Sequence, residues 1–211
     1  MTTKKNDDGD AAKPRLSRRT FLVGTGVTAA ATAALDCRNT ELPNGATSQV
    51  YGPGKVGVTL RINGAERRVD LEPRTTLADA LRFELAMTGT KVVCDRGSCS
   101  ACTVWIDGVP VNACTTFALD AVGRAVTTIE GLARGDELHP VQQAFIDHDA
   151  MQCGFCTPGM VMSCAALVAK NGAPTVDDVR AATSGNLCRC GTYPKVFDAT
   201  IAAARLVKRG A

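Results

Sequence analysis

The chain has 211 residues, 45% of them hydrophobic and only 4% aromatic, so its length allows one or two domains with cores built largely from Ala, Val and Leu. Residues 1–20 hold six of the 24 Lys and Arg but three of the 21 Asp and Glu, and the rest of the chain is therefore balanced in charge. This balance argues against nucleic-acid binding, and no apolar run is long enough to predict a membrane-spanning helix.

The first 37 residues are expected to be an export signal. A polar, basic stretch leads into Ser17-Arg18-Arg19-Thr20-Phe21-Leu22, which resembles a twin-arginine signal, and a weakly hydrophobic run follows to Leu35. Recognition by the twin-arginine export machinery predicts a periplasmic protein exported already folded, with a membrane tether if the signal is not cleaved. A disordered basic tail before a short helix is the alternative. Residues 38–54, rich in Asn, Gly, Pro and Thr, are interpreted as a linker.

Residues 55–130 are predicted to form a sheet with one packed helix. Alternating apolar residues over 56–62 indicate a half-buried strand, and Asn63-Gly64 is typical of a two-residue hairpin turn. A capping box at Thr76–Asp79 predicts the start of the helix. A second hairpin is expected around Asp107-Gly108, and residues 124–129 should form the last strand.

Four cysteines in this region follow the spacing of a plant-type ferredoxin. Four residues separate the first two cysteines, two separate the second and third, and the fourth lies beyond the second hairpin. Gly97 within the loop can adopt the positive φ that a tight metal-binding loop needs. The sequence therefore predicts a [2Fe-2S] cluster on this first cysteine group, with buried or disulfide-bonded cysteines as the alternative. The group consists of Cys94, Cys99, Cys102 and Cys114.

Residues 131–211 are predicted to be helical. Helices are expected from Pro140, from Pro158 with Thr157 as its cap, from Thr175 with a capping box, and from about Pro194. Two close cysteine pairs flank these helices, and the positive end of a helix dipole favours thiolate. A second [2Fe-2S] cluster is predicted on this second cysteine group, with a structural zinc site as the alternative. The group consists of Cys153, Cys156, Cys188 and Cys190.

The remaining candidate groups are given no catalytic role. Cys164 shares a helical face with Cys156 and is expected to be a buried core residue. Neither His139 nor His148 is positioned as a ligand or general base, so no substrate site is expected in this chain. Besides an electron carrier, two further classes stay open. One is a structural module with two zinc sites of four cysteines each, and the other is a secreted disulfide scaffold.

Three stretches together resemble one family. Residues 94–114, 152–159 and 185–191 are similar to the iron-sulfur subunit of the xanthine oxidase family of molybdenum hydroxylases, and the match spans about residues 55–208. With its signal segment, the chain is most similar to the small subunits of periplasmic aldehyde oxidoreductases. The sequence of residues 190–194, Cys-Gly-Thr-Tyr-Pro, resembles a variant of the family motif that is also found in isoquinoline oxidoreductase-like proteins.

The resemblance implies an α+β fold: a β-grasp plant-type ferredoxin domain, residues 55–130, followed by a small four-helix-bundle domain, residues 131–211, each with one [2Fe-2S] cluster. It also implies a large subunit that holds molybdenum on a molybdopterin dinucleotide, with Gln152 and Cys190 beside that pterin. Electrons would pass to FAD on a medium subunit or to another acceptor. Val93 and Ser100 stand where the family more often has glycine, which affects the backbone around the first cluster.

Overall fold

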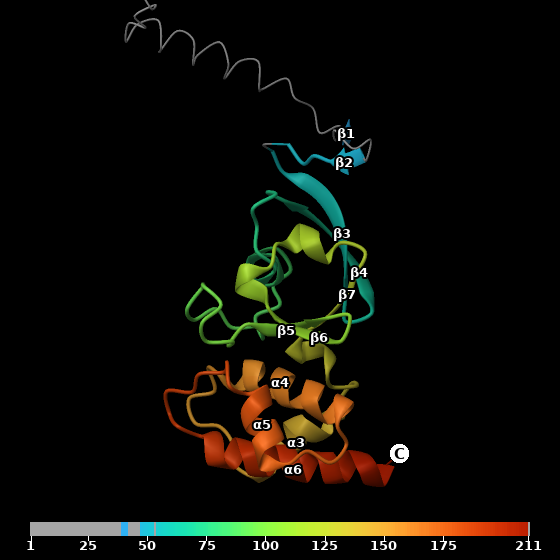
Figure 1. Cartoon of the computed structure of the whole chain (residues 1–211). Helices are drawn as coiled ribbons and strands as arrows, with labels where there is room; N and C mark the ends of the chain where they lie inside the picture. Colours follow the sequence, from blue (N-terminus) through green and yellow to red (C-terminus); the bar gives the residue numbers. More distant parts are fainter. Residues whose placement is uncertain (1–38, 42–46, 53, 211) are drawn as a thin grey trace, which may run out of the picture. The chain divides into compact units, whose positions relative to one another are not determined.

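The computed structural model describes residues 39–41, 47–52 and 54–210 (Figure 1). The predicted export signal lies outside these ranges. Backbone contacts divide the chain into two compact units, residues 1–52 and 53–211. Within the described ranges, none of the helices combines the length and hydrophobicity needed to cross a membrane.

The segment interpreted as a linker contains a short antiparallel hairpin. Strands β1 (Asn39–Glu41) and β2 (Thr47–Gln49) pair in register, with Thr40 opposite Ser48. The linker interpretation missed these strands because three residues are too few to show an alternating apolar pattern.

The second unit begins with a mixed five-stranded sheet in the order β4-β3-β7-β5-β6. Both predicted hairpins are confirmed, and their turn residues adopt the positive φ of type I′ turns: 51° and 81° at Asn63-Gly64, 51° and 78° at Asp107-Gly108. The last strand is shorter than predicted because Ile129 already begins a 3-10 turn. The strands are β3 (Val56–Ile62), β4 (Ala65–Leu71), β5 (Thr103–Ile106), β6 (Val109–Asn112) and β7 (Ala125–Thr127).

A short helix packs on this sheet and carries the first core. Helix α2 (Leu77–Asp79) is capped by Thr76, whose hydroxyl accepts the Asp79 N–H at 3.1 Å, as predicted. The helix then widens into the π-helical turn η1 (Ala80–Glu84). Leu77 and Leu81 are fully buried against the sheet. The 3-10 turns η2 (Ala113–Thr115), η3 (Ala118–Ala121) and η4 (Ile129–Gly131) complete the domain.

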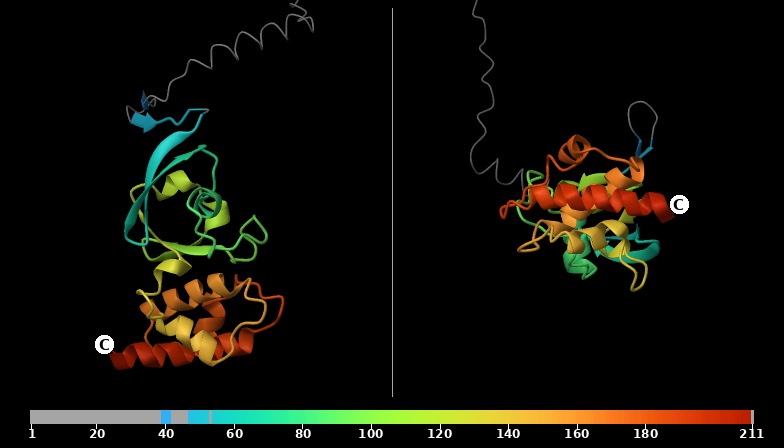
Figure 2. Two further views of the ribbon diagram at one scale, coloured as in Figure 1. Left: turned by 180° about the vertical axis from the view of Figure 1, so that it is seen from behind. Right: turned by 90° about the horizontal axis from the view of Figure 1, so that it is seen from below.

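Four helices surround a second core that includes Phe145 and Met160. They are α3 (Pro140–Asp147), α4 (Thr157–Lys170), α5 (Val176–Ala182) and α6 (Tyr193–Gly210), and α6 covers the outer side (Figure 2). The capping box at Thr175 is confirmed. The cap predicted at Thr157 is wrong, because Thr157 already has helical backbone and Cys156 occupies the N-cap position.

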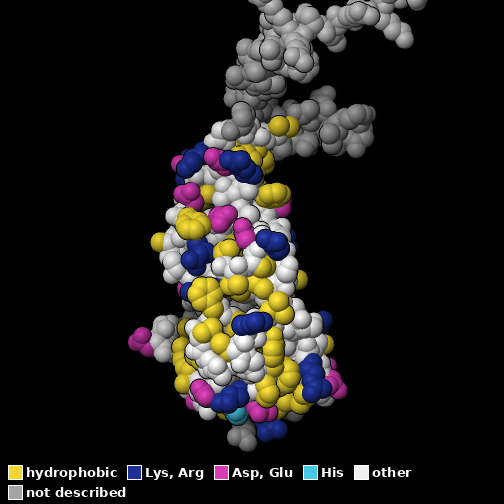
Figure 3. Space-filling model, turned by 90° about the vertical axis from the view of Figure 1, so that its left-hand side faces the viewer, with side chains coloured by type: hydrophobic (Ala, Val, Ile, Leu, Met, Phe, Trp, Pro, Cys, Tyr) yellow, Lys and Arg dark blue, Asp and Glu magenta, His cyan; other side chains and the backbone are white. Residues whose placement is uncertain are grey.

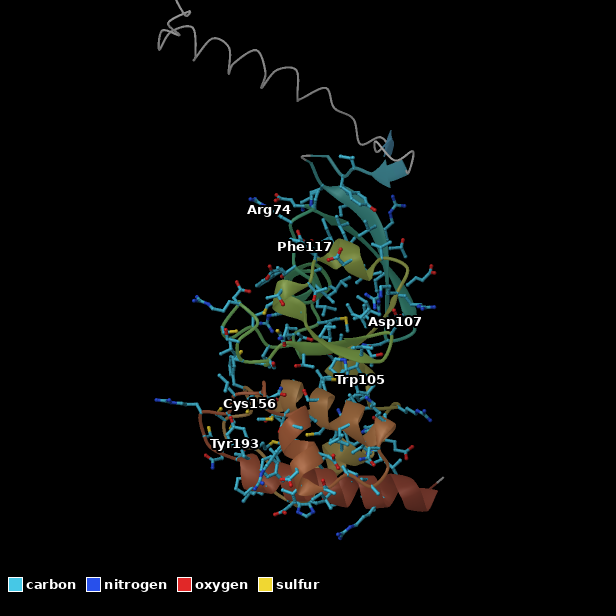
Figure 4. All side chains as sticks on the ribbon, viewed as in Figure 1. Arg74, Trp105, Asp107, Phe117, Cys156 and Tyr193 are labelled. Atoms are coloured by element: carbon cyan, nitrogen blue, oxygen red, sulfur yellow. The ribbon has the colours of Figure 1, made fainter. Side chains whose placement is uncertain are left out.

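The two cores meet where helix α4 packs against strands β5 and β6 (Figures 1 and 2). Trp105 projects from β5 toward the helices (Figure 4), and its indole N–H donates a 2.9 Å hydrogen bond to the Met162 carbonyl oxygen in α4. Trp105 is thus a packing residue, as predicted, but it joins the two domains. The predicted α+β architecture, a β-grasp ferredoxin domain followed by a helical domain, is confirmed.

Candidate metal centres

The first cysteine group is assembled by the loop before β5 and by the second hairpin. Cys94 and Cys99 lie on the loop, and Cys102 immediately precedes β5. The β5–β6 hairpin returns the chain so that Cys114, in η2, donates its backbone N–H to the Cys102 sulfur at 3.5 Å. The fold therefore brings all four predicted residues to one end of the sheet.

Left-handed residues turn the loop backbone toward the sulfurs. Asp95, Gly97 and Ser100 have φ of 54°, 73° and 51°. The Gly97 N–H donates to the Cys114 sulfur at 3.3 Å. Glycine is favoured at positive φ, so the prediction for Gly97 is confirmed. Ser100 occupies the same backbone region, in which glycine is favoured over other residues.

The loop shifts the acidity of its thiols in opposite directions. Backbone N–H groups, above all that of Arg96, lower the pKa of Cys94 to about 7, with a smaller contribution from the Cys99 thiol. Burial, together with the neighbouring Cys114, raises the pKa of Cys102 to about 12. A thiol this buried loses its proton only when a cation replaces it, which is what a metal centre supplies.

The second cysteine group joins the start of α4 to the loop between α5 and α6. The backbone N–H of Phe155 and then the side chain of Cys190 lower the pKa of Cys153, so the two halves of the group lie close together. Burial, followed by the Cys188 side chain, raises the pKa of Cys156 to about 12. Partial burial acts to raise the pKa of Cys188 as well, but hydrogen bonds, chiefly from Thr192, outweigh it and lower that pKa to about 7.

Tyr193 holds the second half of this group, a role that sequence reasoning missed. Its phenol oxygen accepts the Cys188 N–H at 2.7 Å and donates to the Asn186 carbonyl oxygen at 3.1 Å. The two contacts fix the loop that carries Cys188, and the phenol lies beside that loop (Figure 4). The sequence signal that could have predicted this role is the tyrosine three residues after Cys190.

Within each group the thiols lie close enough together to shift one another's pKa. The larger of these effects on the pKa join Cys94 to Cys99 and Cys102 to Cys114 in the first group, and Cys153 to Cys190 and Cys156 to Cys188 in the second. Among the described residues, no three Cys, His, Asp or Glu side chains converge as ligands of a single ion would. A [2Fe-2S] cluster takes two thiolates on each of its two irons, so the paired donors fit this cofactor.

The other cysteines that the structure describes add no further ligand. All nine described cysteines are free thiols. Cys164 is fully buried, and burial raises its pKa to about 12, so its predicted place in the core is confirmed.

An apolar cavity of about 500 Å³ lies between the two cysteine groups. Cys94 and Cys99 line it from one side and Cys153, Cys156 and Cys188 from the other. Its remaining lining includes three hydrophobic side chains that are more than half exposed: Val93, Phe155 and Leu187. The cysteine loops project to one side in Figure 1, and hydrophobic side chains gather on the face seen from that side (Figure 3).

Each domain matches a separate family model. Residues 60–124 match the 2Fe-2S iron-sulfur cluster binding domain, and residues 128–201 match the [2Fe-2S] binding domain. Each match contains one complete cysteine group.

Individual relatives extend these matches. The chain is 39% identical to the aldehyde oxidoreductase iron-sulfur-binding subunit PaoA of Escherichia coli O157:H7, covering 92% of this chain and 90% of that subunit. It is 44% identical to the nicotine 6-hydroxylase small subunit of Paenarthrobacter nicotinovorans, covering 70% of this chain and 88% of that one. Among solved structures, quinoline 2-oxidoreductase from Pseudomonas putida 86 matches with a TM-score of 0.71 and 44% identity, over 74% of this chain and 98% of that chain. Aldehyde oxidoreductase from Desulfovibrio gigas matches with a TM-score of 0.70 and 38% identity, over 74% of this chain but 18% of that chain.

Proposed function

The chain belongs to the family of iron-sulfur small subunits of the molybdenum hydroxylases, and from this membership we propose that it carries electrons through two [2Fe-2S] clusters between partner subunits. The source is a molybdopterin centre in a large subunit, and the acceptor is FAD on a medium subunit or another carrier. The observation that carries the proposal is the convergence of eight cysteines into two groups, one in each domain. The chain is thus a subunit of an oxidoreductase complex.

The ligands of the first cluster are proposed to be Cys94, Cys99, Cys102 and Cys114, and those of the second Cys153, Cys156, Cys188 and Cys190. When bound, each cluster supplies a carrier for one electron at a time. The residues of this chain bring the thiols together, direct N–H groups at sulfur, and bury three of the four thiols of the first group within the β-grasp domain. Hydrogen bonds to sulfur and solvent exposure set the potential of such centres.

The second cluster is proposed to face the molybdenum subunit. Gln152 and Cys153 are both exposed beside it, and Phe155 next to them is 56% exposed. By family resemblance, Gln152 and Cys190 lie beside the pterin. An exposed polar amide flanked by an apolar side chain suits contact with a polar cofactor at a protein interface.

Aldehydes are the proposed substrate class of the complex. The match to PaoA covers 92% of this chain and therefore extends into the region before residue 53, whereas the nicotine hydroxylase match covers 70%. Copurifying the complex and assaying it with aldehydes and with N-heterocycles tests this assignment. Turnover of N-heterocycles alone would contradict it.

Export as a folded protein to the periplasm is also proposed, and it depends on Arg18 and Arg19 in the twin-arginine pattern. Replacing both arginines with lysine should keep the subunit in the cytoplasm, while replacing Lys4 and Lys5 with arginine should not. Equal export of the two variants, measured by fractionation, would contradict the proposal.

Metal analysis tests the central claim. Purified subunit should be red-brown and contain about four irons per chain, two for each cluster. A colourless protein that contains zinc would instead support the structural zinc module.

A further inference from the structure

Helix α4 meets the first cysteine loop without any side chain between them. Gly159 is buried in the first turn of α4, three residues after Cys156. An ideal Cβ on Gly159 would overlap the carbonyl oxygen of Ser100 and would lie 3.0 Å from the Cα and the carbonyl oxygen of Ala101. All of these are backbone atoms, so no flexible side chain could move aside. Only glycine permits this approach.

The helix itself has no need of glycine at this position. Glycine is a poor helix former, and Gly159 does not have the positive φ that would favour it over other residues. Its place is therefore explained by the close packing of two backbones. This packing joins the domain of the second cysteine group to the loop of the first.

The same loop segment is held from a second direction by the residues before Cys188. The Leu187 N–H donates to the carbonyl oxygen of Cys99 at 3.1 Å. The Asn186 side-chain amide donates to the carbonyl oxygen of Ser100, also at 3.1 Å. Residues 99–101 are thus held between one residue near Cys156 and the two residues that precede Cys188, and these contacts fix the relative position of the two cysteine groups.

We propose that Gly159 is a positioning residue that sets the separation of the two clusters and hence the rate at which electrons pass between them. The inference rests on the proposed function, because it requires both clusters. With both clusters bound, the two cysteine groups would hold them for the exchange of one electron, in which no bond forms or breaks. A methyl group at residue 159 would push α4 away from Ser100 and separate the cysteine groups while leaving all eight thiolates in the chain.

The experiment compares the full chain, loaded with both clusters, as wild type, Gly159→Ala and Gly172→Ala. Gly172 lies just beyond the other end of α4, has nothing within 4 Å of an added Cβ, and serves as the matched control. Two quantities are measured on the reduced protein. One is the magnetic interaction between the clusters, seen as splitting of their electron paramagnetic resonance signals, and the other is the rate of electron equilibration after rapid partial reduction. Both fall steeply as the clusters move apart.

Gly159→Ala should keep both signals but show smaller splitting and slower equilibration, while Gly172→Ala should behave as wild type. Unchanged splitting and rate in Gly159→Ala would overturn the inference, even if its thermal stability fell. If Gly159→Ala loses a cluster, Asn186→Ala is measured in its place. It removes a hydrogen bond to Ser100 at the same junction and introduces no steric overlap. Wild-type coupling in that variant would overturn the inference. Wild-type protein without iron would instead refute the proposed function.

Discussion

The hydroxyl of Thr192 lies 3.2 Å from the sulfur of Cys188. A thiolate bound to iron has no proton to donate, so in the loaded protein the hydroxyl must be the donor. Thr192 is buried, which limits competition from water for this hydrogen bond. A donor at sulfur stabilises the reduced, more negative state of a cluster and so raises its reduction potential.

Thr192→Val should therefore lower the reduction potential of the second cluster. A net hydrogen-bond contribution of about 1 kcal/mol corresponds to a shift in reduction potential of about 40 mV for a one-electron couple. Thr192→Ser keeps the hydroxyl and should restore most of the potential. Redox titration followed by electron paramagnetic resonance measures both clusters, and a shift confined to the first cluster would contradict the assignment.

Loss of one ligand should remove one cluster and leave the other. Cys99→Ser removes a proposed ligand of the first cluster, and Cys156→Ser removes a proposed ligand of the second. Each variant should fall from about four irons per chain to about two, with one of the two resonance signals retained. Each variant is the control for the other. Loss of both signals in either variant would mean that the domains do not assemble their clusters separately.

The hydrogen bond from Trp105 to Met162 should stabilise the contact between the two domains. Trp105→Phe removes the N–H donor and keeps an aromatic ring, so the free energy of unfolding should fall by about 1 kcal/mol. For a chain of this size the melting temperature should fall by roughly 2–4 °C. Phe83→Leu, at a side chain that is 74% exposed, is the control and should change the melting temperature little. An equal fall in melting temperature in the two variants would show that loss of the hydrogen bond between the domains is not the cause.

His139 should make stability depend on pH. Its Nδ1 accepts the Val141 N–H at 3.2 Å and caps α3. Burial, and then Arg134, lowers the pKa of His139 below its ordinary 6.5. Because the unfolded chain binds the proton more readily than the folded chain, the contribution of His139 to the free energy of unfolding depends on pH. It is fully present above pH 6.5 and is lost as the pH falls through the lower pKa of the folded state.

His139→Asn keeps a side-chain acceptor at the cap and should remove this part of the pH dependence. His148→Asn, at the other end of α3, should leave it in place. Thermal unfolding of the two variants between about pH 5.5 and 8 gives the comparison. A wild-type pH profile in His139→Asn would contradict the role of the cap.

Local sequence patterns predicted most of the fold. Alternation in β3, the two turn dipeptides, the cap from the Thr76 hydroxyl and the capping box at Thr175 all appear as expected. Each of these signals lies within a few residues, where backbone preferences act directly. The predictions failed where no local signal existed, as in the three-residue strands β1 and β2, and where two adjacent residues could both begin a helix, as at Cys156 and Thr157.

The sequence by itself determined which cysteines form each group and which family they resemble, because ligand spacing is a property of the chain. Tertiary structure alone decided how the groups are joined. Trp105 reaches Met162 across 57 residues, and Asn186 reaches Ser100 across 86. The overlap that excludes a side chain at Gly159 likewise depends on a loop far earlier in the chain. Contacts between segments so far apart arise only when the two cores pack together, so neighbouring residues carry no sign of them.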